Sequence, residues 1–572
     1  MKILQRSKNI ILAGAVFFIL FSATRVGAVN FSDSISFYVD ENFDASARSQ
    51  ITATLVKTAP GLYFYIEKNW WDSQLPAKQS EIIYSIENLS TEFHNKIYPT
   101  LTSVFGYEWK PGVDGDEKIT VLFHPMKEGA GGYFREADEY LKLQTSDSNE
   151  REMLYLPTGQ IESPEMKVFL AHELVHLIIF NQKDRIFSAQ DEVWLNEMRA
   201  DYSSTILGYD TPYSGSNLRK RVQTFLEKPT DSLTEWQETK YDYGIAGVFT
   251  SYLVDHYSIN VLIDSLKTKL IGINSINYAL QKNLAKENFS QIFTNWTIAS
   301  VINDCSLGLK YCYLNVNLSS FRLNPTLNFL PLSGNSSLSV TNVTKNWAGN
   351  WQKIIGGSGD LKLNFSSLAG LDFMVPYIVF DKNNSYSINF LELDKKEQGE
   401  INLKNFGNDY NSLIILPSLQ TKVIGFDGSE FTYPYTFTVS IAGQAPQEDP
   451  VLIQKLLDQI AELKKQIADI IAQRNGGNNS SAPCSQLNNN LYFGMSNNED
   501  VKCLQSFLKS QGSGIYPEGL VTGNFGGLTK SAVIRFQEKY RAEILIPLGL
   551  FSGTGVVGPA TRAKLNSFLS GG

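Results

Sequence analysis

Apolar residues recur every three or four positions across residues 77–105, a spacing that predicts one helix with a hydrophobic face. Short runs rich in β-branched and aromatic residues lie on both sides of this segment, and such runs favour strands. They cover residues 37–39, 51–57, 61–67 and 118–124. Helical spacing with few breakers then dominates residues 164–304. The pattern predicts a first domain, residues 33–304, that mixes strands and helices.

Residues 315–442 have a different character, because they are rich in Ser, Asn, Thr and Gly. Short β-type runs recur among them, at a spacing typical of a β-sandwich. Examples are residues 359–365, 377–380 and 437–441. We therefore expect a β-sandwich-like domain over residues 315–442. A Pro- and Gly-containing linker, residues 443–450, follows it.

A heptad pattern occupies residues 450–474. One seam position holds Ile453, Ile460 and Ile467, and the other holds Leu456, Leu463 and Ile470. Ile and Leu in these two positions favour a parallel two-stranded coiled coil, so this segment predicts a short helix that joins two copies into a homodimer. The alternative is a single spacer helix packed on a neighbour. A second linker, residues 475–483, separates this helix from a small domain at residues 484–569.

The amino terminus has the layout of an export signal. Lys2, Arg6 and Lys8 precede an apolar run over residues 10–23, and Val26-Gly27-Ala28 places small residues before a cleavage point. The apolar run is shorter than the roughly 20 residues that span a bilayer. We expect a signal peptide at residues 1–28 and a secreted or cell-wall-associated protein. An uncleaved N-terminal membrane anchor is the alternative.

Composition narrows the classes of partner. Hydrophobic residues make up 43% of the 572 residues and charged residues 19%, which excludes disorder throughout. The formal charge is −8 and no long basic run occurs, so we expect no nucleic acid partner.

The four cysteines can form disulfides outside the cytoplasm, in three connectivities. We favour Cys305–Cys312 and Cys484–Cys503, because each pair lies close in sequence and within one expected domain. Four free thiols are the alternative.

The chemistry is concentrated in two nearby segments. His172 and His176 are four positions apart, so on a helix both imidazoles lie on one face and can reach one metal ion. Glu173, next to His172, is placed to contact a water on that ion and to act as the general base. Two ordinary core histidines on a buried helix are the alternative.

A second helical segment offers a third ligand. Glu197 follows within the run Glu-Val-Trp-Leu-Asn-Glu-Met-Arg-Ala-Asp-Tyr at residues 192–202. Two His and one Glu leave the fourth tetrahedral position of Zn²⁺ open, as in catalytic zinc sites. Asp201 lies one turn further on the same face, where we expect it to accept the free ring N–H of a ligand histidine.

These two segments, His-Glu-Leu-Val-His and Trp-Leu-Asn-Glu-Met-Arg-Ala-Asp, resemble the gluzincin metallopeptidases, which include thermolysin and the aminopeptidase N-like enzymes. Residues 118–134, with Gly-Ala-Gly-Gly-Tyr-Phe at 129–134, look most like the hyicolysin-type neutral zinc proteases. The resemblance covers about residues 50–300 and implies an α+β zincin-type catalytic domain. No Gly-Ala-Met-Glu-Asn motif is present, so an endopeptidase is favoured over an aminopeptidase.

The resemblance also implies how substrate is held. An edge strand would bind a peptide by β-addition, and residues 118–124 are the candidate strand. Gly131 and Gly132 would let the peptide backbone approach closely, although a plain surface loop is the alternative. Tyr241, in the segment Tyr-Asp-Tyr-Gly, matches the tyrosine that donates a hydrogen bond to the oxyanion in aminopeptidase N-like enzymes. Tyr243 and then His256 are the alternative donors.

The last domain contains one pattern twice, Gly-x-x-Gly-x-x-Thr followed by a basic residue, around Thr529 and Thr561. Each threonine can start a helix after a tight glycine turn. This pattern resembles the peptidoglycan-binding type 1 domain over residues 484–569 and implies a small three-helix fold with peptidoglycan as partner. A generic interaction module of the same fold is the alternative.

The whole chain is therefore expected to be multidomain. Its favoured function is that of a secreted Zn²⁺-dependent metalloendopeptidase that cleaves proteins or peptides and is anchored to the cell wall. One alternative is a hydrolase of peptidoglycan stem peptides. The other is a wall-binding protein without catalysis.

Overall fold

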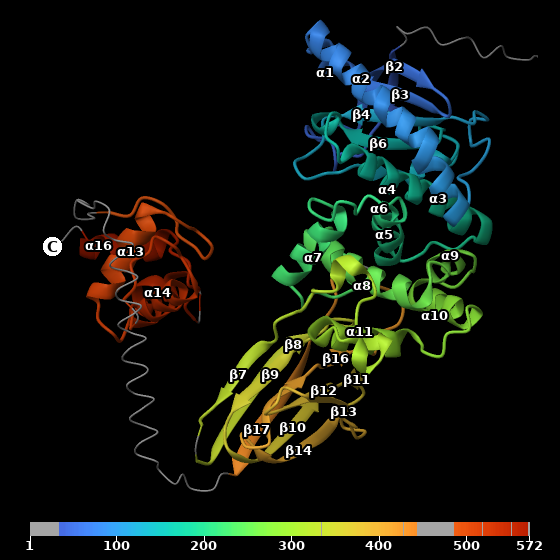
Figure 1. Cartoon of the computed structure of the whole chain (residues 1–572). Helices are drawn as coiled ribbons and strands as arrows, with labels where there is room; N and C mark the ends of the chain where they lie inside the picture. The colour runs from blue at the N-terminus through green and yellow to red at the C-terminus, as the bar shows by residue number, and fades with distance from the viewer. Residues whose placement is uncertain are drawn as a thin grey trace, which may run out of the picture. The chain divides into compact units, whose positions relative to one another are not determined.

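A computed structural model describes residues 34–332, 334–426, 428–442, 486–517, 519–548, 550 and 552–569 (Figure 1). The chain forms two compact units, Met1–Pro446 and Gln447–Gly572. The signal peptide expected at residues 1–28, the coiled coil expected at 450–474 and Cys484 all lie outside the described residues. Among the described helices, none combines the length and the apolar character needed to cross a membrane.

The first unit begins with a six-stranded sheet in the order β1-β2-β3-β4-β6-β5. Its strands are β1 Ser34–Tyr38, β2 Gln50–Ala59, β3 Leu62–Glu67, β4 Ile119–His124, β5 Tyr133–Phe134 and β6 Met153–Pro157. β4 is paired in parallel with β3 on one side and with β6 on the other. The prediction that residues 118–124 form an edge strand is therefore wrong. Every residue of β4 is buried, and the edge nearest to it in sequence is β5.

Helices pack against this sheet. They are α1 Lys68–Asp72, α2 Pro76–Glu92 and α3 Tyr98–Phe105, with a π-helical turn, η1 Phe93–Ile97, between the last two. The apolar stripe predicted over residues 77–105 supplies the buried face, because Ile82, Ile86, Phe93 and Ile97 are each at most 3% exposed. Their side chains share one core with Phe64 of β3 and Val121 of β4.

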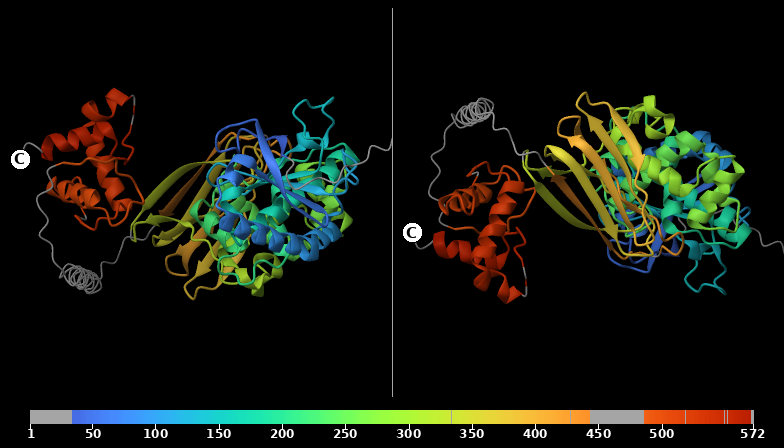
Figure 2. Two further views of the ribbon diagram at one scale, coloured as in Figure 1. Left: turned by 90° about the horizontal axis from the view of Figure 1, so that it is seen from above. Right: turned by 90° about the horizontal axis from the view of Figure 1, so that it is seen from below.

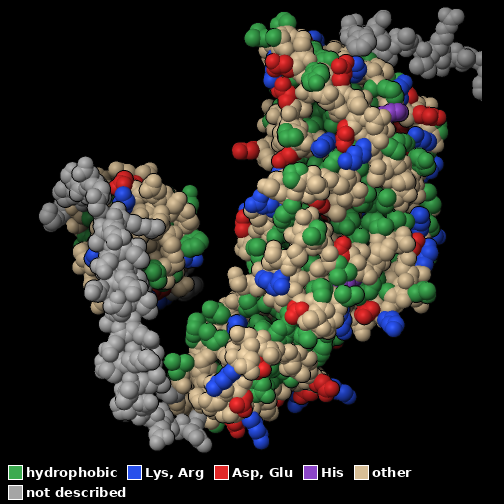
Figure 3. Space-filling view, viewed as in Figure 1, with side chains coloured by type: hydrophobic (Ala, Val, Ile, Leu, Met, Phe, Trp, Pro, Cys, Tyr) green, Lys and Arg blue, Asp and Glu red, His purple; other side chains and the backbone are tan. Residues whose placement is uncertain are grey.

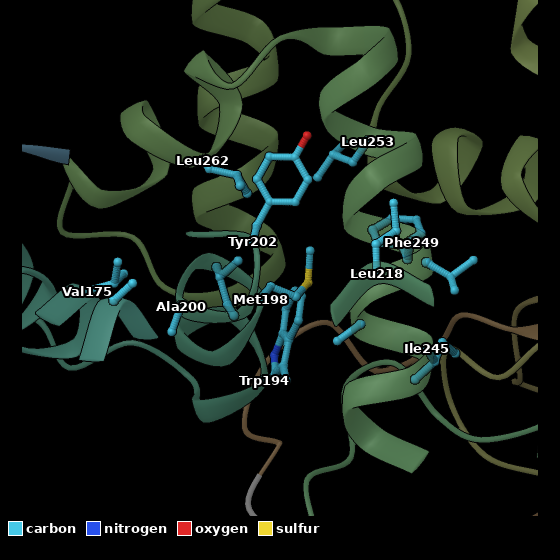
Figure 4. Packing of buried hydrophobic residues seen from close by; sticks show 14 of the residues in the cluster. Val175, Trp194, Met198, Ala200, Tyr202, Leu218, Ile245, Phe249, Leu253 and Leu262 are labelled. Atoms are coloured by element: carbon cyan, nitrogen blue, oxygen red, sulfur yellow. The ribbon is translucent and has the colours of Figure 1, made fainter. Parts of the chain in front are cut away.

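A second group of helices follows the sheet in sequence. It comprises α4 Met166–Ile179, η4 Phe180–Arg185, α5 Val193–Asp201, α6 Ser203–Ile206, α7 Asn217–Glu227, α8 Lys240–Tyr257, α9 Asn260–Leu266, α10 Gly272–Lys282 and α11 Phe289–Ile302. Figure 4 shows Trp194 and Met198 of α5 pointing toward Leu218 of α7 and Phe249 of α8. This apolar packing fixes α5 against α4 and α8, the three helices that carry the chemistry described below.

Strands dominate residues 326–442, called here the β-region. They are β7 Thr326–Leu330, β8 Ser336–Thr344, β9 Gln352–Gly356, β10 Gly359–Ser367, β11 Phe373–Met374, β12 Pro376–Asp381, β13 Tyr386–Phe390, β14 Gln398–Phe406, β15 Tyr410–Ile415, β16 Ser418–Leu419 and β17 Tyr433–Ala442. β8, β17, β10 and β14 form one antiparallel group. β13, β12, β15 and β9 form another, and β7 is added to β9 in parallel. Only the pair Phe406 and Tyr410 joins β14 to β15. Alternate residues of both groups, such as Leu363 and Leu413, share one apolar core.

The β-region belongs to the same compact unit as the helices. In Figure 1 the helices α7, α8 and α11 lie between the first sheet and the strands of the β-region. Figure 2 agrees with this order, because the blue N-terminal elements are in front in the view from above and the strands of the β-region are in front in the view from below. The connection contains a disulfide, Cys305–Cys312, as predicted. Cys503 is also disulfide-bonded, but its expected partner Cys484 is outside the described residues.

The remaining described elements are short 3-10 helices: η2 Glu136–Glu139, η3 Thr158–Gln160, η5 Cys305–Leu307, η6 Leu309–Tyr311, η7 Val316–Leu318 and η8 Ile546–Leu548.

The C-terminal module is small and helical. Its helices are α13 Glu499–Ser510, α14 Gly527–Lys539, α15 Arg541–Ile544 and α16 Pro559–Leu569. The Gln505 amide donates to the Asn524 carbonyl and to the Thr529 hydroxyl, each at 2.9 Å. Gln537 repeats both bonds, at 2.9 Å, to Val556 and Thr561. The repeated glycine and threonine pattern in the sequence is thus a repeated hydrogen-bonded turn.

Candidate metal centre

Helix α4 places two imidazoles side by side. His172 and His176 are one helical turn apart, and their Nε2 atoms lie 3.1 Å from each other. The helix is held rigidly, because Leu170, Leu174 and Val175 are fully buried in the core around it. The two rings therefore project from one face of a fixed element toward the same point, as the four-residue spacing predicts.

Helix α5 brings a carboxylate to that point. Glu197 Oε2 lies 3.1 Å from His172 Nε2, and Oε1 lies 3.4 Å from His176 Nε2. Within the described part of the chain, these three residues are the one group of three or more His, Cys, Asp or Glu side chains whose ligand atoms all lie within 4.8 Å of one another. Donors about 2.0–2.1 Å from a shared tetrahedral ion are about 3.3 Å apart. The observed separations fit zinc and its preferred ligands.

The two glutamates at the centre have pKa values shifted in opposite directions. Burial works to raise the pKa of Glu197, but the charge of His176 and the hydrogen bonds from both imidazoles outweigh it and lower the pKa below its ordinary value. Glu173 is 5% exposed. Burial raises the pKa of Glu173 to about 8, with His176 acting against the shift and Glu197 reinforcing it. The two glutamates therefore have opposite electrostatic environments although both lie at the same centre.

The glycines singled out in the sequence contact α4. A Cβ on Gly132 would lie 3.0 Å from the Glu173 side chain and 2.8 Å from the Tyr155 carbonyl oxygen, and Gly132 has φ +156°. A Cβ on Gly131 would lie 2.9 Å from the ring of Phe169. Both positions thus need glycine in order to pack against the helix that carries the metal ligands. The edge strand β5 begins at the next residue, Tyr133.

The two candidate tyrosines lie in different surroundings. The ring of Tyr243 is 6.3 Å from that of His172 between centroids and contacts Trp236 at 4.8 Å. The ring of Tyr241 instead lies 5.2 Å from the ammonium groups of Lys228 and Lys240. The geometry therefore favours the alternative, Tyr243, over Tyr241. Residues two apart on a helix point about 200° apart, so α8 can direct only one of the two toward the metal ligands.

Asp201 does not have the partner that the sequence predicts. Its carboxylate accepts hydrogen bonds from Arg221, the shortest at 2.6 Å, and from the Asn217 amide at 2.9 Å. The prediction that it orients a ligand histidine is wrong in this respect, because α7 delivers a guanidinium to the same carboxylate. The Arg221 guanidinium also lies 4.6 Å from the centre of the Tyr243 ring. No sequence motif indicates Arg221 or Trp236.

His256, the last alternative donor, is remote from the centre in its contacts. Its Nε2 lies 2.9 Å from the Cys312 carbonyl oxygen, beside the disulfide, and its ring packs on Tyr252 at 4.4 Å. Burial lowers the pKa of His256, so the neutral ring donates its N–H to that carbonyl. The residue has a structural role at the end of α8.

Comparison with known proteins identifies one part of the chain. Residues 497–544 match the family model of a peptidoglycan binding domain. This match supports peptidoglycan as a partner and a location at the cell wall or elsewhere outside the cytoplasm. No metallopeptidase family model matches the first unit, and no curated protein matches the chain.

Three solved structures with some likeness are each matched over 20% of this chain. They include the Yersinia pseudotuberculosis-derived mitogen, 12% identical, with 92% of its chain covered and a TM-score of 0.14. PliG of Aeromonas hydrophila, a periplasmic inhibitor of g-type lysozyme, is 11% identical, with 98% covered and a TM-score of 0.14. The pre-peptidase C-terminal domain of a Bacillus anthracis collagenase is 6% identical, with 96% covered and a TM-score of 0.13. Likeness at these scores carries no functional argument.

On the face seen in Figure 3, acidic and basic side chains are interspersed, without a single-sign patch.

Proposed function

We propose that the protein is a zinc metalloendopeptidase that acts at the cell wall. The observation that carries the proposal is the meeting of His172, His176 and Glu197 at 3.1–3.4 Å, with Glu173 buried beside them. Two imidazoles and one carboxylate are a catalytic ligand set, because they leave one position open. Zinc held there would polarise the scissile carbonyl and lower the pKa of a bound water to about 7.

Glu173 performs the proton transfers in this proposal. Its carboxylate accepts the proton of the attacking water and then delivers it to the nitrogen of the leaving amine. The residue is held for this task from two sides. Helix α4 fixes its backbone, and Gly132 lies close enough that any larger residue would displace the carboxylate.

Tyr243 stabilises the oxyanion in this proposal. Burial and the nearby charge of Glu197 raise the pKa of Tyr243 well above its ordinary value, so the phenol is protonated at neutral pH and donates its O–H to the negative oxygen of the tetrahedral intermediate. Arg221 packs on its ring from one side and Trp236 contacts it from another. These contacts restrict the ring and so lessen the entropy lost when the hydrogen bond forms.

Substrate binding follows from the sheet. β5 is the last strand in the sheet order and pairs with β6 alone. Its other edge can take an extended peptide as an added strand. The glycines that precede β5 lie against Phe169 and Glu173 of α4, so a peptide on this edge would pass close to the general base.

A second function is favoured by the C-terminal module. Because the module matches a peptidoglycan binding domain, the substrate of the first unit can be the stem peptides of peptidoglycan itself. The same ligand set would serve, since the bond hydrolysed is again an amide. Proteins remain the preferred substrate class here, because β5 offers an extended edge suited to a linear chain.

The test uses the whole chain purified with zinc. Wild type is assayed for metal content, for cleavage of casein, for release of amines from peptidoglycan and for sedimentation with peptidoglycan. Casein cleavage supports the proposal, and amine release alone supports the second function. The Glu173→Gln variant should keep about one zinc per chain and sediment like wild type, yet lose about 10²–10⁴-fold in rate. A zinc-free wild type, or a fully active Glu173→Gln, contradicts the proposal.

A further inference from the structure

A histidine outside the metal centre, His124, is enclosed at the carboxyl end of β4. Neither its side chain nor that of Asp44 is exposed to solvent. His124 Nδ1 lies 3.2 Å from Asp44 Oδ2, and His124 Nε2 lies 3.2 Å from the hydroxyl oxygen of Tyr133. The same oxygen accepts the Asp40 backbone N–H at 3.1 Å. A chain of hydrogen bonds thus joins the segment after β1, the end of β4 and the first residue of β5.

The direction of each hydrogen bond follows from the Asp40 N–H, which can only donate. The Tyr133 oxygen accepts that proton, so its own O–H is free to donate to His124 Nε2. Because an accepting Nε2 carries no proton, the imidazole proton lies on Nδ1 and is donated to Asp44. Burial works to raise the pKa of Asp44, but hydrogen bonds from Arg48 outweigh it and lower the pKa to about 2. Burial lowers the pKa of His124, with Asp44 acting against the shift, so the ring is neutral at neutral pH.

Tyr133 is anchored by its ring as well as by its hydroxyl. The ring is stacked on Tyr155 of β6 at 4.3 Å between centroids and on Phe43 at 4.6 Å. β5 itself has few backbone restraints, because its pairing with β6 is confined to Tyr133 and Phe134. The position of β5 therefore depends on the Tyr133 side chain, whose hydroxyl is bonded to His124.

Tyr133 directly follows the glycine that lies against the proposed general base. A Cβ on Gly132 would be 3.0 Å from the Glu173 side chain. A peptide added to the free edge of β5 would bond to the backbone of this strand, next to that glycine. When a binding strand is already fixed before its ligand arrives, less conformational freedom is lost on binding and the affinity is higher.

We propose that His124 is a positioning residue, which holds β5 through Tyr133 in the arrangement that receives the substrate peptide. This inference rests on the proposed peptidase function and on β5 as the strand that binds the peptide. Loss of the hydrogen-bonded chain should then raise KM and leave kcat nearly unchanged. A residue that only stabilised the fold would have the opposite signature, because unfolded molecules lower the apparent kcat at an unchanged KM.

The experiment compares two pairs of identical substitutions in the full chain with zinc bound. His124→Phe and Tyr133→Phe, singly and together, remove the hydrogen bonds and keep an aromatic ring at each position. His256→Phe and Tyr252→Phe are the matched controls, because these two rings also pack together, at 4.4 Å, but beside the disulfide. KM and kcat are measured on a peptide excised from casein. Binding of that peptide to the same variants combined with Glu173→Gln, measured by calorimetry, is a readout independent of turnover.

Each single change in the first pair should raise KM and the calorimetric Kd about tenfold, with kcat nearly unchanged. The double variant should also differ from wild type about tenfold, because the second change removes a partner that is already lost. His256→Phe and Tyr252→Phe should lower the melting temperature and keep the wild-type KM. Tyr133→Phe keeps both stacking contacts, so it should fold even if His124→Phe does not.

Nitrogen NMR of wild type labelled in its histidines should show His124 protonated at Nδ1 alone at neutral pH. Protonation at Nε2 overturns this inference. So does an unchanged KM in the single variants, a hundredfold effect in the double variant, or a loss of kcat alone. The peptidase proposal survives each of these results, and it fails instead if wild type with one zinc bound does not cleave casein.

Discussion

Two glutamates of the first unit, the partly exposed Glu197 and the buried Glu139, lie in opposite electrostatic surroundings. Glu197 sits between two imidazoles, which lower its pKa despite burial. Glu139, in η2, is 2% exposed, and neither of its carboxylate oxygens has a hydrogen-bond partner in the described part of the chain. Burial and four neighbouring carboxyl groups raise the pKa of Glu139 well above its ordinary value. These neighbours are Glu152, Asp138, Asp114 and Glu108.

The difference teaches what a buried carboxylate requires. Beside His172 and His176 the charged form is stabilised, and the site is suited to a cation. Among carboxyl groups the charged form of Glu139 is disfavoured, which raises the pKa of this carboxyl on folding. Its neighbour Glu152 follows the same rule, since burial raises the pKa of Glu152 to about 7. The proposed zinc chemistry depends on the first arrangement, whereas the second makes the stability of the folded protein depend on pH.

The largest expected effect comes from removing one imidazole of the first arrangement. His176→Ala should lose zinc and lower peptidase activity about 10³-fold or more, because several kcal/mol of transition-state stabilisation depend on the metal. Metal analysis and casein cleavage measure both effects. His94→Ala changes an exposed histidine outside the centre and should match wild type. Full zinc retention in His176→Ala would refute the ligand assignment.

The next effect concerns the two tyrosines of α8. Tyr243→Phe should lower kcat about 10²–10³-fold with little change in KM, because the hydrogen bond to the oxyanion forms only in the transition state. Tyr241→Phe should be near neutral, since that ring faces Lys228 and Lys240. Steady-state kinetics of both variants at equal zinc content decide the question. The reverse order of effects would assign the donor to Tyr241.

The smallest expected effect tests the second arrangement. A carboxyl whose pKa is raised on folding contributes stability below its ordinary pKa of 4.5 and loses it as pH rises toward the folded-state pKa, by at most about 1.4 kcal/mol per pH unit. Glu139→Gln removes this loss. Its melting temperature should equal that of wild type within a few degrees at pH 5 and exceed it at pH 8.

Glu128→Gln is the matched control, because Glu128 is exposed and lies nearby in the sequence. Its free energy of unfolding should differ from that of wild type by no more than about 0.5 kcal/mol at either pH. A Glu139→Gln variant that melts below wild type at pH 8 would indicate that the Glu139 carboxylate is charged and paired in solution.

Local patterns of the sequence predict local structure well. The histidine spacing fixes a shared face of α4, and the apolar stripe over residues 77–105 becomes the buried face of α2, η1 and α3. The three side chains predicted to bind metal, His172, His176 and Glu197, lie together: spacing within α4 puts both imidazoles on one face, and the packing of α5 on α4 brings Glu197 to them. The Cys305–Cys312 disulfide is likewise a short-range feature.

What the sequence could not provide depends on packing between distant segments. β4 is an interior strand because β3 and β6 flank it, and no pattern within residues 118–124 encodes which strands are neighbours. The choice between Tyr241 and Tyr243 depends on the rotation of α8 about its axis. Asp201 meets Arg221 because α7, which packs on α8, brings that guanidinium to the end of α5. Glu139 meets other carboxyl groups because the connection from α3 to β4 and the residue before β6 converge on η2.

The repeated turn of the C-terminal module has a consequence for how that module folds. Gln505 reaches Asn524 and Thr529 at sequence separations of 19 and 24 residues, and Gln537 reaches Val556 and Thr561 at the same separations. Helix α14 supplies Thr529 to the first turn and Gln537 to the second, so neither turn can close unless α14 is formed. The module is thus expected to unfold in one cooperative step, and a partly opened form would have to break both turns together.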